Sequence, residues 1–275
     1  MRIHAINTAV LSVKTRYVKS KGRIRALRLT SVLLDPKFCD IPVYTWAIEH
    51  PEGVIVIDTG ETAQVNDPDY FPAIQRPYWH SQYRFHVSPQ NEIGPQLRQR
   101  GINPEDVRWL IMTHAHFDHT GSLSQFPNAE VIFSRKEYED VQMFRSAHFD
   151  FPSKYPSWLK PKLIDYVPER VGPFEASFPV TKAGDVHIVP TPGHTMGHQS
   201  VVLHHDGFTW FFAGDASFDQ GSLLNGTLDA PAFNSNVTLE TRQRIIDYAK
   251  QMPMIYLATH DHDTERRATE RMTVF

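Results

Sequence analysis

Histidines and aspartates gather in a few short segments of this sequence, with the spacing of metal ligands. His114, His116, Asp118 and His119 fall within six residues, directly after a predicted strand. Three further candidates each follow another predicted strand. The full set is His114, His116, Asp118, His119, His194, Asp215 and His260. Zn²⁺ is bound by imidazole nitrogen and carboxylate oxygen, so strand ends that meet at one sheet edge would build a metal centre from these side chains.

Seven ligands are too many for one tetrahedral ion. Two ions about 3.5–4 Å apart, bridged by a carboxylate and a hydroxide, account for the number. We therefore expect two Zn²⁺ per chain, with Mn, Co or Fe as other ions that such donors accept. The alternative is that these residues are hydrogen-bonded polar groups on loops, although buried ionisable clusters without a ligand are costly.

Composition narrows the class of protein. The chain has 275 residues, fifteen histidines and a single cysteine, Cys39, which excludes an internal disulfide and a cysteine zinc finger. A net charge of −3 argues against nucleic acid and membrane surfaces as partners and leaves a small-molecule substrate. We find no targeting segment and no apolar run of the ~20 residues that span a bilayer, so the expected location is cytoplasmic.

Hydrophobic patterning predicts strands alternating with helices along the whole chain. The predicted strands are 1–13, 24–34, 43–48, 53–58, 107–112, 130–133, 185–190, 199–205, 208–213 and 254–258, and the predicted helices are 91–100, 239–252 and one that begins after Ser134. Ser134 and Glu137 have the spacing of a capping box at the start of that helix. The order indicates two sheets packed face to face with helices outside, an α+β sandwich of four layers (αββα) in one domain, 1–275.

Two segments, 67–90 and 145–180, are rich in proline and aromatic residues and are predicted as loops or lids. Their aromatic side chains would line or cover a small-molecule pocket. Equally, they would bury the interface of a homodimer, where aromatics are also enriched.

Five motifs of the chain resemble the metallo-β-lactamase superfamily, in the order of that family. They are Val-Ile-Asp-Thr-Gly (56–60), Thr-His-Ala-His-Phe-Asp-His-Thr-Gly (113–121), Thr-Pro-Gly-His-Thr-Met-Gly-His (191–198), Ala-Gly-Asp-Ala-Ser (213–217) and Thr-His-Asp (259–261). Within the superfamily, the sequence is most similar to quorum-quenching N-acyl homoserine lactonases.

The resemblance implies a ligand for each metal position. It assigns His114, His116 and His194 to one metal, and Asp118, His119 and His260 to the other, with Asp215 bridging the two. It also makes Asp58 an outer residue that orients a ligand histidine, where turn chemistry alone would make it a strand-end residue. His198 lies close to His194 in sequence and is interpreted as structural.

The implied reaction is hydrolysis of a lactone or a related small cyclic ester. Two divalent ions lower the pKa of a bridging water from 15.7 toward neutrality, and the resulting hydroxide attacks the carbonyl. Asp118, a ligand with a free oxygen, is expected to take the hydroxide proton and pass it to the leaving group. Asp215 would fix the separation of the metals. Phe117 and Phe218 are the expected pocket residues.

One position departs from the lactonase pattern. Those enzymes carry a tyrosine three residues after the bridging aspartate, where this chain has Phe218. A phenyl ring donates no hydrogen bond, so the oxyanion would need the metal or another donor. A mononuclear iron enzyme similar to persulfide dioxygenases, and a thioesterase or aryl esterase of the same superfamily, are the alternative functions.

Overall fold

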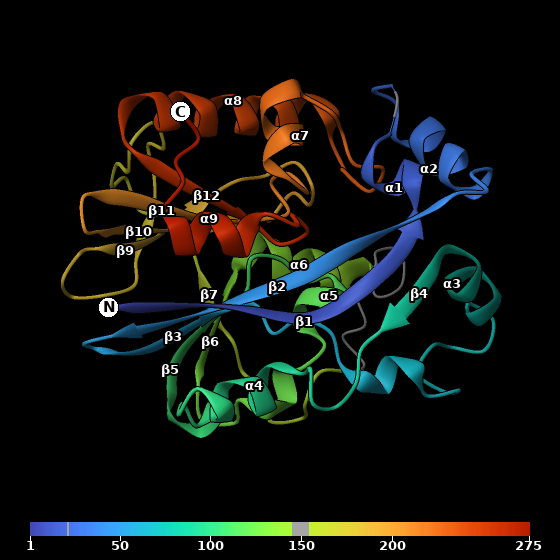
Figure 1. The fold of residues 1–275 in the computed structure, drawn as a ribbon, viewed down its shortest axis with the longest axis horizontal. Coiled ribbons are helices and arrows are strands. Elements are labelled where there is room, and N and C mark those ends of the chain that lie inside the picture. The colour runs from blue at the N-terminus through green and yellow to red at the C-terminus, as the bar shows by residue number, and fades with distance from the viewer. Residues whose placement is uncertain (21, 145–153) are drawn as a thin grey trace.

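The computed structural model describes residues 1–20, 22–144 and 154–275. Two β-sheets lie face to face, and helices cover the outer surface of each (Figure 1). In that view α7 and α8 lie along the top of the molecule and α4 lies at the bottom, with both sheets between them. The predicted four-layer α+β sandwich is confirmed.

The first sheet has seven strands among the described residues. In spatial order they are β4 (Tyr83–His86), β1 (Arg2–Lys14), β2 (Phe38–His50), β3 (Gly53–Ile57), β5 (Val107–Ile111), β6 (Glu130–Ser134) and β7 (Lys162–Ile164). Strands β3, β5, β6 and β7 pair in parallel. Because parallel strands end at the same edge, Asp58 after β3 and the 113–119 segment after β5 are brought together there.

The second sheet has five strands in the described part of the chain. In spatial order they are β12 (Met254–Ala258), β11 (Phe208–Gly214), β10 (Gln199–His205), β9 (Val186–Pro190) and β8 (Phe178–Pro179). Only β11 and β12 pair in parallel within this sheet, so Asp215 and His260 leave it at neighbouring points. His194 follows β9 on the same sheet.

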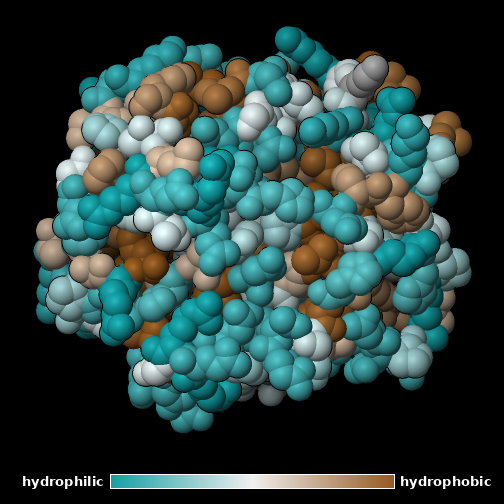
Figure 2. Space-filling model, in the orientation of Figure 1, coloured by the Kyte–Doolittle hydropathy of each residue, from teal (hydrophilic) through white to brown (hydrophobic). Residues whose placement is uncertain are grey.

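The hydrophobic core has one layer between the sheets and one on each outer face. Trp46 and Ile111 of the first sheet meet Ile188 and Phe212 of the second in the central layer. Helix α4 (Ile93–Gln99) packs Ile93 and Leu97 against the first sheet, and α8 (Ser235–Gln251) packs Ile245 against the second. Hydrophilic residues cover most of the face in Figure 2, with hydrophobic residues in small separate areas.

Short helices connect these elements. They are α1 (Thr15–Val18), α2 (Arg25–Leu33), α3 (Arg76–Gln82), α5 (Phe117–Thr120), α6 (Arg135–Phe144), α7 (Gln220–Asn225) and α9 (Thr264–Glu270), with 3₁₀ turns at Ala63–Asn66, Pro104–Asp106 and Leu123–Gln125. In the described part of the chain, no helix combines the length and apolar character needed to cross a bilayer.

The prediction of a strand at 24–34 is wrong, because this segment forms helix α2. The apolar run suggested a buried strand, yet Leu27 and Leu34 are 63% and 79% exposed. The buried residues are Arg28 and Val32, one helical turn apart. The Arg28 guanidinium bonds the Ala232 carbonyl and the Ser235 hydroxyl, which replace the apolar contacts that a strand would have made.

The predicted loop at 67–90 contains helix α3 and strand β4, which pairs with β1. Phe71, Trp79 and Tyr83 are buried there in an aromatic cluster. Of the predicted loop at 145–180, the described part includes β7 and β8, and residues 145–153 lie outside the described residues.

Candidate metal centre

All seven predicted ligands lie together where the two sheets meet at their strand ends. They form two groups, and in each group the donor atoms lie within 4.8 Å of one another. The first group is His114, His116, His194 and Asp215, and the second is Asp118, His119 and His260. Every member is buried. Because each group takes residues from both sheets, the centre forms only when the sheets pack together.

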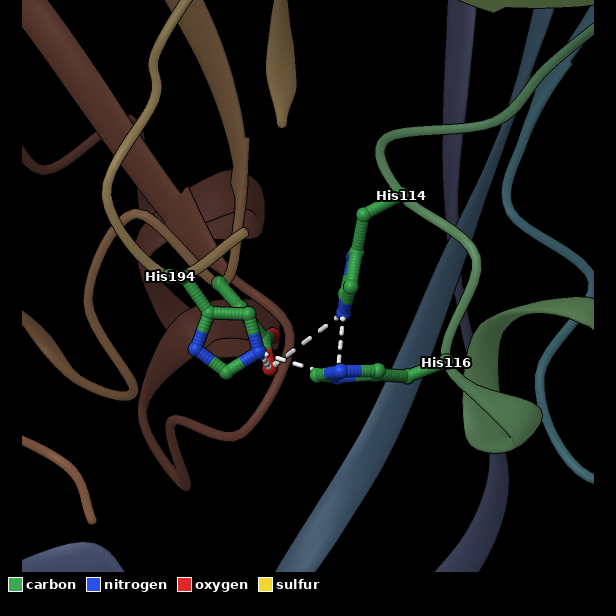
Figure 3. A group of neighbouring side chains, drawn as sticks. His114, His116 and His194 are labelled. Atoms are coloured by element: carbon green, nitrogen blue, oxygen red, sulfur yellow. Dashed lines mark hydrogen bonds and ion pairs between the residues drawn. The ribbon is translucent and has the colours of Figure 1, made fainter. Parts of the chain in front are cut away.

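The first group holds three histidine nitrogens in a tight cluster. His116 Nδ1 lies 3.0 Å from both His114 Nε2 and His194 Nε2. Figure 3 shows His114 and His116 on one loop and His194 approaching from the opposite side. Asp215 Oδ2 lies 3.3 Å from His194 Nε2 and 3.9 Å from His114 Nε2, which completes a four-donor cage.

The second group is more open. Asp118 Oδ2 lies 3.5 Å from His260 Nε2 and 4.0 Å from His119 Nε2. Asp215 also reaches this group, with Oδ2 3.3 Å from His260 Nε2 and Oδ1 3.4 Å from His119 Nε2. Asp215 thus stands between the two groups, as expected for a bridging carboxylate.

The outer nitrogens of three histidines show which atoms face the centre. Nδ1 of His119 donates to Asp58 at 2.8 Å, and Nδ1 of His194 donates to Asp229 at 2.9 Å. Nδ1 of His260 donates to the Pro42 carbonyl at 2.8 Å. A neutral imidazole carries one proton, so in each ring the Nε2 lone pair points inward.

Nitrogen lone pairs that point inward, together with the Asp215 carboxylate, form a set of donor atoms suited to a cation. Within the described residues, His119 Nε2 and Asp215 Oδ1 are buried atoms without a hydrogen-bond partner. Unpaired buried polar atoms are unfavourable unless a ligand satisfies them. Imidazole and carboxylate donors of this kind fit divalent zinc and similar ions.

Asp58 lies behind the second group, in contact with a ligand histidine. It has a left-handed backbone (φ 59°) at the end of β3. Its carboxylate accepts hydrogen bonds from the Thr113 amide and the Thr113 hydroxyl, both at 2.7 Å, and from His119. This geometry fits the expected role of orienting His119. The turn at the end of β3 places the Asp58 carboxylate beside that histidine.

Asp229 has the same relation to the first group and was not predicted from the sequence. One carboxylate oxygen accepts from His194 Nδ1, and the other accepts from the Arg242 guanidinium at 3.0 Å. It lies between α7 and α8, 35 residues after His194 and outside any recognisable motif. Asp229 lies six residues before the start of α8, whose N-cap is Asn234, so neither a motif nor a helix cap marks it in the sequence.

His198 is buried and supports the centre without belonging to either ligand group. Its Nε2 accepts a hydrogen bond from the Asp215 amide at 3.0 Å, which places the ring proton on Nδ1, facing the Thr191 carbonyl. Burial lowers the pKa of His198 to about 3, so the ring remains neutral. These contacts agree with its interpretation as structural.

The charges of the centre are strongly coupled. Burial alone would raise the pKa of Asp215, but His260, His119 and His194 hold it well below its usual range. Burial, with His119 and His116 close by, lowers the pKa of His114 well below the ordinary histidine value. An ionised carboxylate beside a neutral imidazole is the form that binds a metal.

The two predicted pocket residues are both buried beside the centre. Phe218 is 2% exposed, and its ring centroid lies 4.7 Å from that of His260 and 5.8 Å from that of His194. Phe117 is 3% exposed and packs edge-on against Trp79 at 5.3 Å. A cavity of about 390 Å³ opens at His260, with Val18, Lys19, Cys39 and Ile41 on its walls.

Comparison with known proteins places the geometry in a family. The model of the Metallo-beta-lactamase superfamily matches residues 40–260. An N-acyl homoserine lactonase of a Bacillus species is 28% identical over 93% of this chain and 96% of its own length. The N-acyl homoserine lactonase AttM of Rhizobium radiobacter is 27% identical over 82% of this chain and 83% of its own.

Solved structures show the same fold. An N-acyl homoserine lactone hydrolase with the product N-hexanoyl-L-homoserine bound at its catalytic metal centre matches with a TM-score of 0.74 and 22% identity, covering 96% of this chain and 94% of that one. The dizinc quorum-quenching lactonase AidC matches with a TM-score of 0.66 and 13% identity, over 94% and 86%. The resemblance inferred from the motifs is confirmed, as is the enzyme class, a metal-dependent hydrolase acting on ester bonds.

Proposed function

Because the chain belongs to the metallo-beta-lactamase superfamily, we propose that it is a dinuclear zinc hydrolase that opens the ring of N-acyl homoserine lactones or related small cyclic esters. The observation that carries the proposal is the sharing of Asp215 between two groups of buried ligands. The names of the curated relatives support the substrate class. The dizinc relative supports the metal and its number.

Bound ions would polarise the substrate carbonyl and lower the pKa of water from 15.7 toward ~7. The side chains of the chain supply the rest. Asp215 holds the two groups at a fixed separation through both of its oxygens. Asp58, Asp229 and the Pro42 carbonyl orient three of the histidines so that Nε2 of each ring faces the centre.

Asp118 is the proposed proton carrier. Its side chain is 11% exposed, whereas those of His119, His260 and Asp215 are at most 3% exposed. Asp118 therefore has the most open carboxylate of the centre. It accepts the proton of the attacking water and returns it to the leaving oxygen, so the alkoxide departs as an alcohol.

Tyr17 is the proposed hydrogen-bond donor that compensates for Phe218. Its ring centroid lies 5.9 Å from that of Phe218, which itself contacts His260 and His194. The Ala230 amide donates to the Tyr17 carbonyl at 2.8 Å, which ties α1 to the segment that carries Asp229. Burial, with Asp118 and Asp215 nearby, raises the pKa of the Tyr17 hydroxyl, which keeps it protonated as a donor to the substrate carbonyl.

The cavity at His260 is the proposed entry for substrate. Its volume of about 390 Å³ falls in the range of small-molecule sites. Val18 and Ile41 offer apolar contact. The polar contacts come from Lys19, Arg267 and four aspartates, at positions 40, 219, 261 and 263. A lactone with an acyl amide needs both kinds of contact.

A substrate panel on zinc-loaded protein tests the proposal, with metal content measured on the same sample. The panel sets short- and long-chain homoserine lactones beside aromatic lactones, aryl esters, a thioester and a persulfide. We expect close to two zinc ions per chain and ring opening of the homoserine lactones. One iron per chain with oxygen uptake, or thioester cleavage without lactone opening, would contradict it.

A further inference from the structure

A buried carboxylate lies between the two loops that carry the first ligand group. Glu137, on α6, is 4% exposed. Its Oε1 accepts a hydrogen bond from the Ala115 amide at 3.0 Å, and its Oε2 accepts one from the Thr195 hydroxyl at 2.7 Å. Ala115 separates His114 from His116, and Thr195 follows His194. One side chain therefore joins the two loops, which come from different sheets.

Ser134 strengthens the same junction from the residue before α6. Its hydroxyl donates to the Gly197 carbonyl at 2.6 Å and accepts from the Glu137 amide at 3.1 Å. A Cβ on Gly197 would lie 2.2 Å from the Glu137 nitrogen, so the 194–198 loop rests directly on the start of the helix. Half of the predicted capping box is thus present: Ser134 caps the helix, but the Glu137 side chain turns to the ligand loops instead.

We propose that Glu137 is a positioning residue that sets the distance between His194 and the His114–His116 pair. The inference rests on the proposed two-ion centre. In the part of the chain that is described, no hydrogen bond of Glu137 or Ser134 reaches Asp118, His119 or His260. Loss of Glu137 should therefore weaken ion binding at the first group and spare the second.

The role requires acceptor geometry more than charge. Burial raises the pKa of Glu137, and the hydrogen bonds from Thr195 and Ala115 oppose that rise. A glutamine has almost the same shape. Its carbonyl oxygen can accept from Ala115, and its amide can donate to the Thr195 hydroxyl, which accepts as readily as it donates. Glu137→Gln should therefore keep the two loops joined, whereas Glu137→Ala should release them.

The test is titration of metal-free protein with Zn²⁺ against a competing chelator, together with total zinc content. For Glu137→Ala, we expect one of the two zinc affinities to fall by roughly 10–100-fold, the range for outer partners of metal ligands, and the other to stay within about threefold. Glu137→Gln should keep both affinities within about threefold of the parent protein. Thr195→Val, which removes one contact only, should lower the same single affinity by a few fold and serves if the alanine variant does not fold.

Glu92 provides a matched control. It also accepts hydrogen bonds from a backbone amide, Ala63 at 2.7 Å, and a threonine hydroxyl, Thr62 at 3.0 Å. Neither residue adjoins a candidate ligand. Glu92→Ala should lower the midpoint of thermal unfolding without changing either zinc affinity, so a general loss of stability is separated from loss of positioning.

The outcomes distinguish the two proposals. If Glu137→Ala leaves both zinc affinities unchanged, or lowers both equally, the positioning role is wrong while the two-ion function stands. If the parent protein binds a single zinc ion, the two-ion function is wrong. In that case the positioning role is still decided by whether Glu137→Ala weakens that one ion more than Glu92→Ala does.

Discussion

The two ligand groups of the centre are built differently, although they share Asp215. In the first group, His114 Nε2 and His194 Nε2 each lie 3.0 Å from His116 Nδ1. Two carboxylates, those of Asp229 and Glu137, support this group from outside. In the second group, Asp118 Oδ2 lies 3.5 Å from His260 Nε2 and 4.0 Å from His119 Nε2. The outer nitrogen of His260 is bonded to the Pro42 backbone carbonyl and not to a carboxylate. The first group is the more compact of the two, and Asp118 of the second group has the more exposed carboxylate.

Removal of the shared ligand should have the largest effect, because it breaks both groups at once. Asp215→Ala deletes the carboxylate that lies between His194, His260 and His119. We expect kcat/KM to fall by roughly 10³-fold or more, since metal stabilisation of the developing charge contributes several kcal/mol. Zinc content should drop at both positions. Full retention of two zinc ions would show that Asp215 does not bridge.

Asp118 should separate chemistry from metal binding in the open group. Asp118→Asn keeps an oxygen that can bind a metal but removes the acceptor for the water proton. We expect kcat to fall by roughly 10²–10⁴-fold, the range for general acid–base groups, with zinc content close to the parent value. Equal losses of kcat and zinc would instead identify Asp118 as a ligand without a proton-transfer role.

Substitution of Tyr17 tests whether its hydroxyl is the hydrogen-bond donor that compensates for Phe218. Tyr17→Phe should lower kcat/KM for lactones by roughly tenfold to a hundredfold, less than the ~10²–10³ for a donor that acts without a metal. Metal content should not change. Adding Phe218→Tyr to the Tyr17→Phe variant supplies a phenol hydroxyl at position 218 in place of the one lost at position 17. This second substitution should restore part of the rate. An unaltered rate in Tyr17→Phe would exclude the hydroxyl as a substrate contact.

The outer aspartates offer a symmetrical comparison. Asp229→Asn should weaken zinc at the first group and Asp58→Asn zinc at the second, each by about 10-fold, because each carboxylate orients one ligand histidine. Chelator competition measures both affinities in each variant. The same position weakened by both substitutions would mean that the two groups do not act as separate sites.

Lowering the pH should also distinguish the two groups, and we expect this effect to be the smallest of those predicted. Burial disfavours protonation of His119 and His260, but Asp215 and the neighbouring carboxylates outweigh it and raise the pKa of both. The pKa of His114 is lowered. Protons compete with the metal for histidine, and they bind first where the pKa is higher. As pH falls, zinc should leave the second group before the first, which stepwise measurement of bound zinc against pH can follow.

The ligands could be predicted from the sequence because they are packed into short motifs at strand ends. His114 to His119 fall within six residues, from the loop after β5 into α5, and a strand precedes each of His194, Asp215 and His260. The sandwich followed from apolar runs between glycines and prolines. These patterns are local, so they can be recognised in the sequence without knowledge of the tertiary contacts.

The supports of the ligands could not be predicted, since they act across long separations. Asp229 reaches His194 over 35 residues, and Glu137 reaches Thr195 over 58. In isolation, Glu137 has the pattern of a capping box, and only the packing of the second sheet turns its side chain elsewhere. Residues 24–34 were misassigned for a similar reason: a distant carbonyl and hydroxyl make a buried arginine favourable there.

Each group draws donors from both sheets, and this has a consequence for how the protein matures. Neither half of the sandwich can offer a complete coordination shell by itself, so a nascent chain would hold zinc only weakly until its halves have docked. Tight metal uptake is then a late event that reports completed assembly. Once bound, the ions would link the two sheets. Removal of the ions by a chelator should therefore weaken the packing of one sheet on the other before it unfolds either sheet.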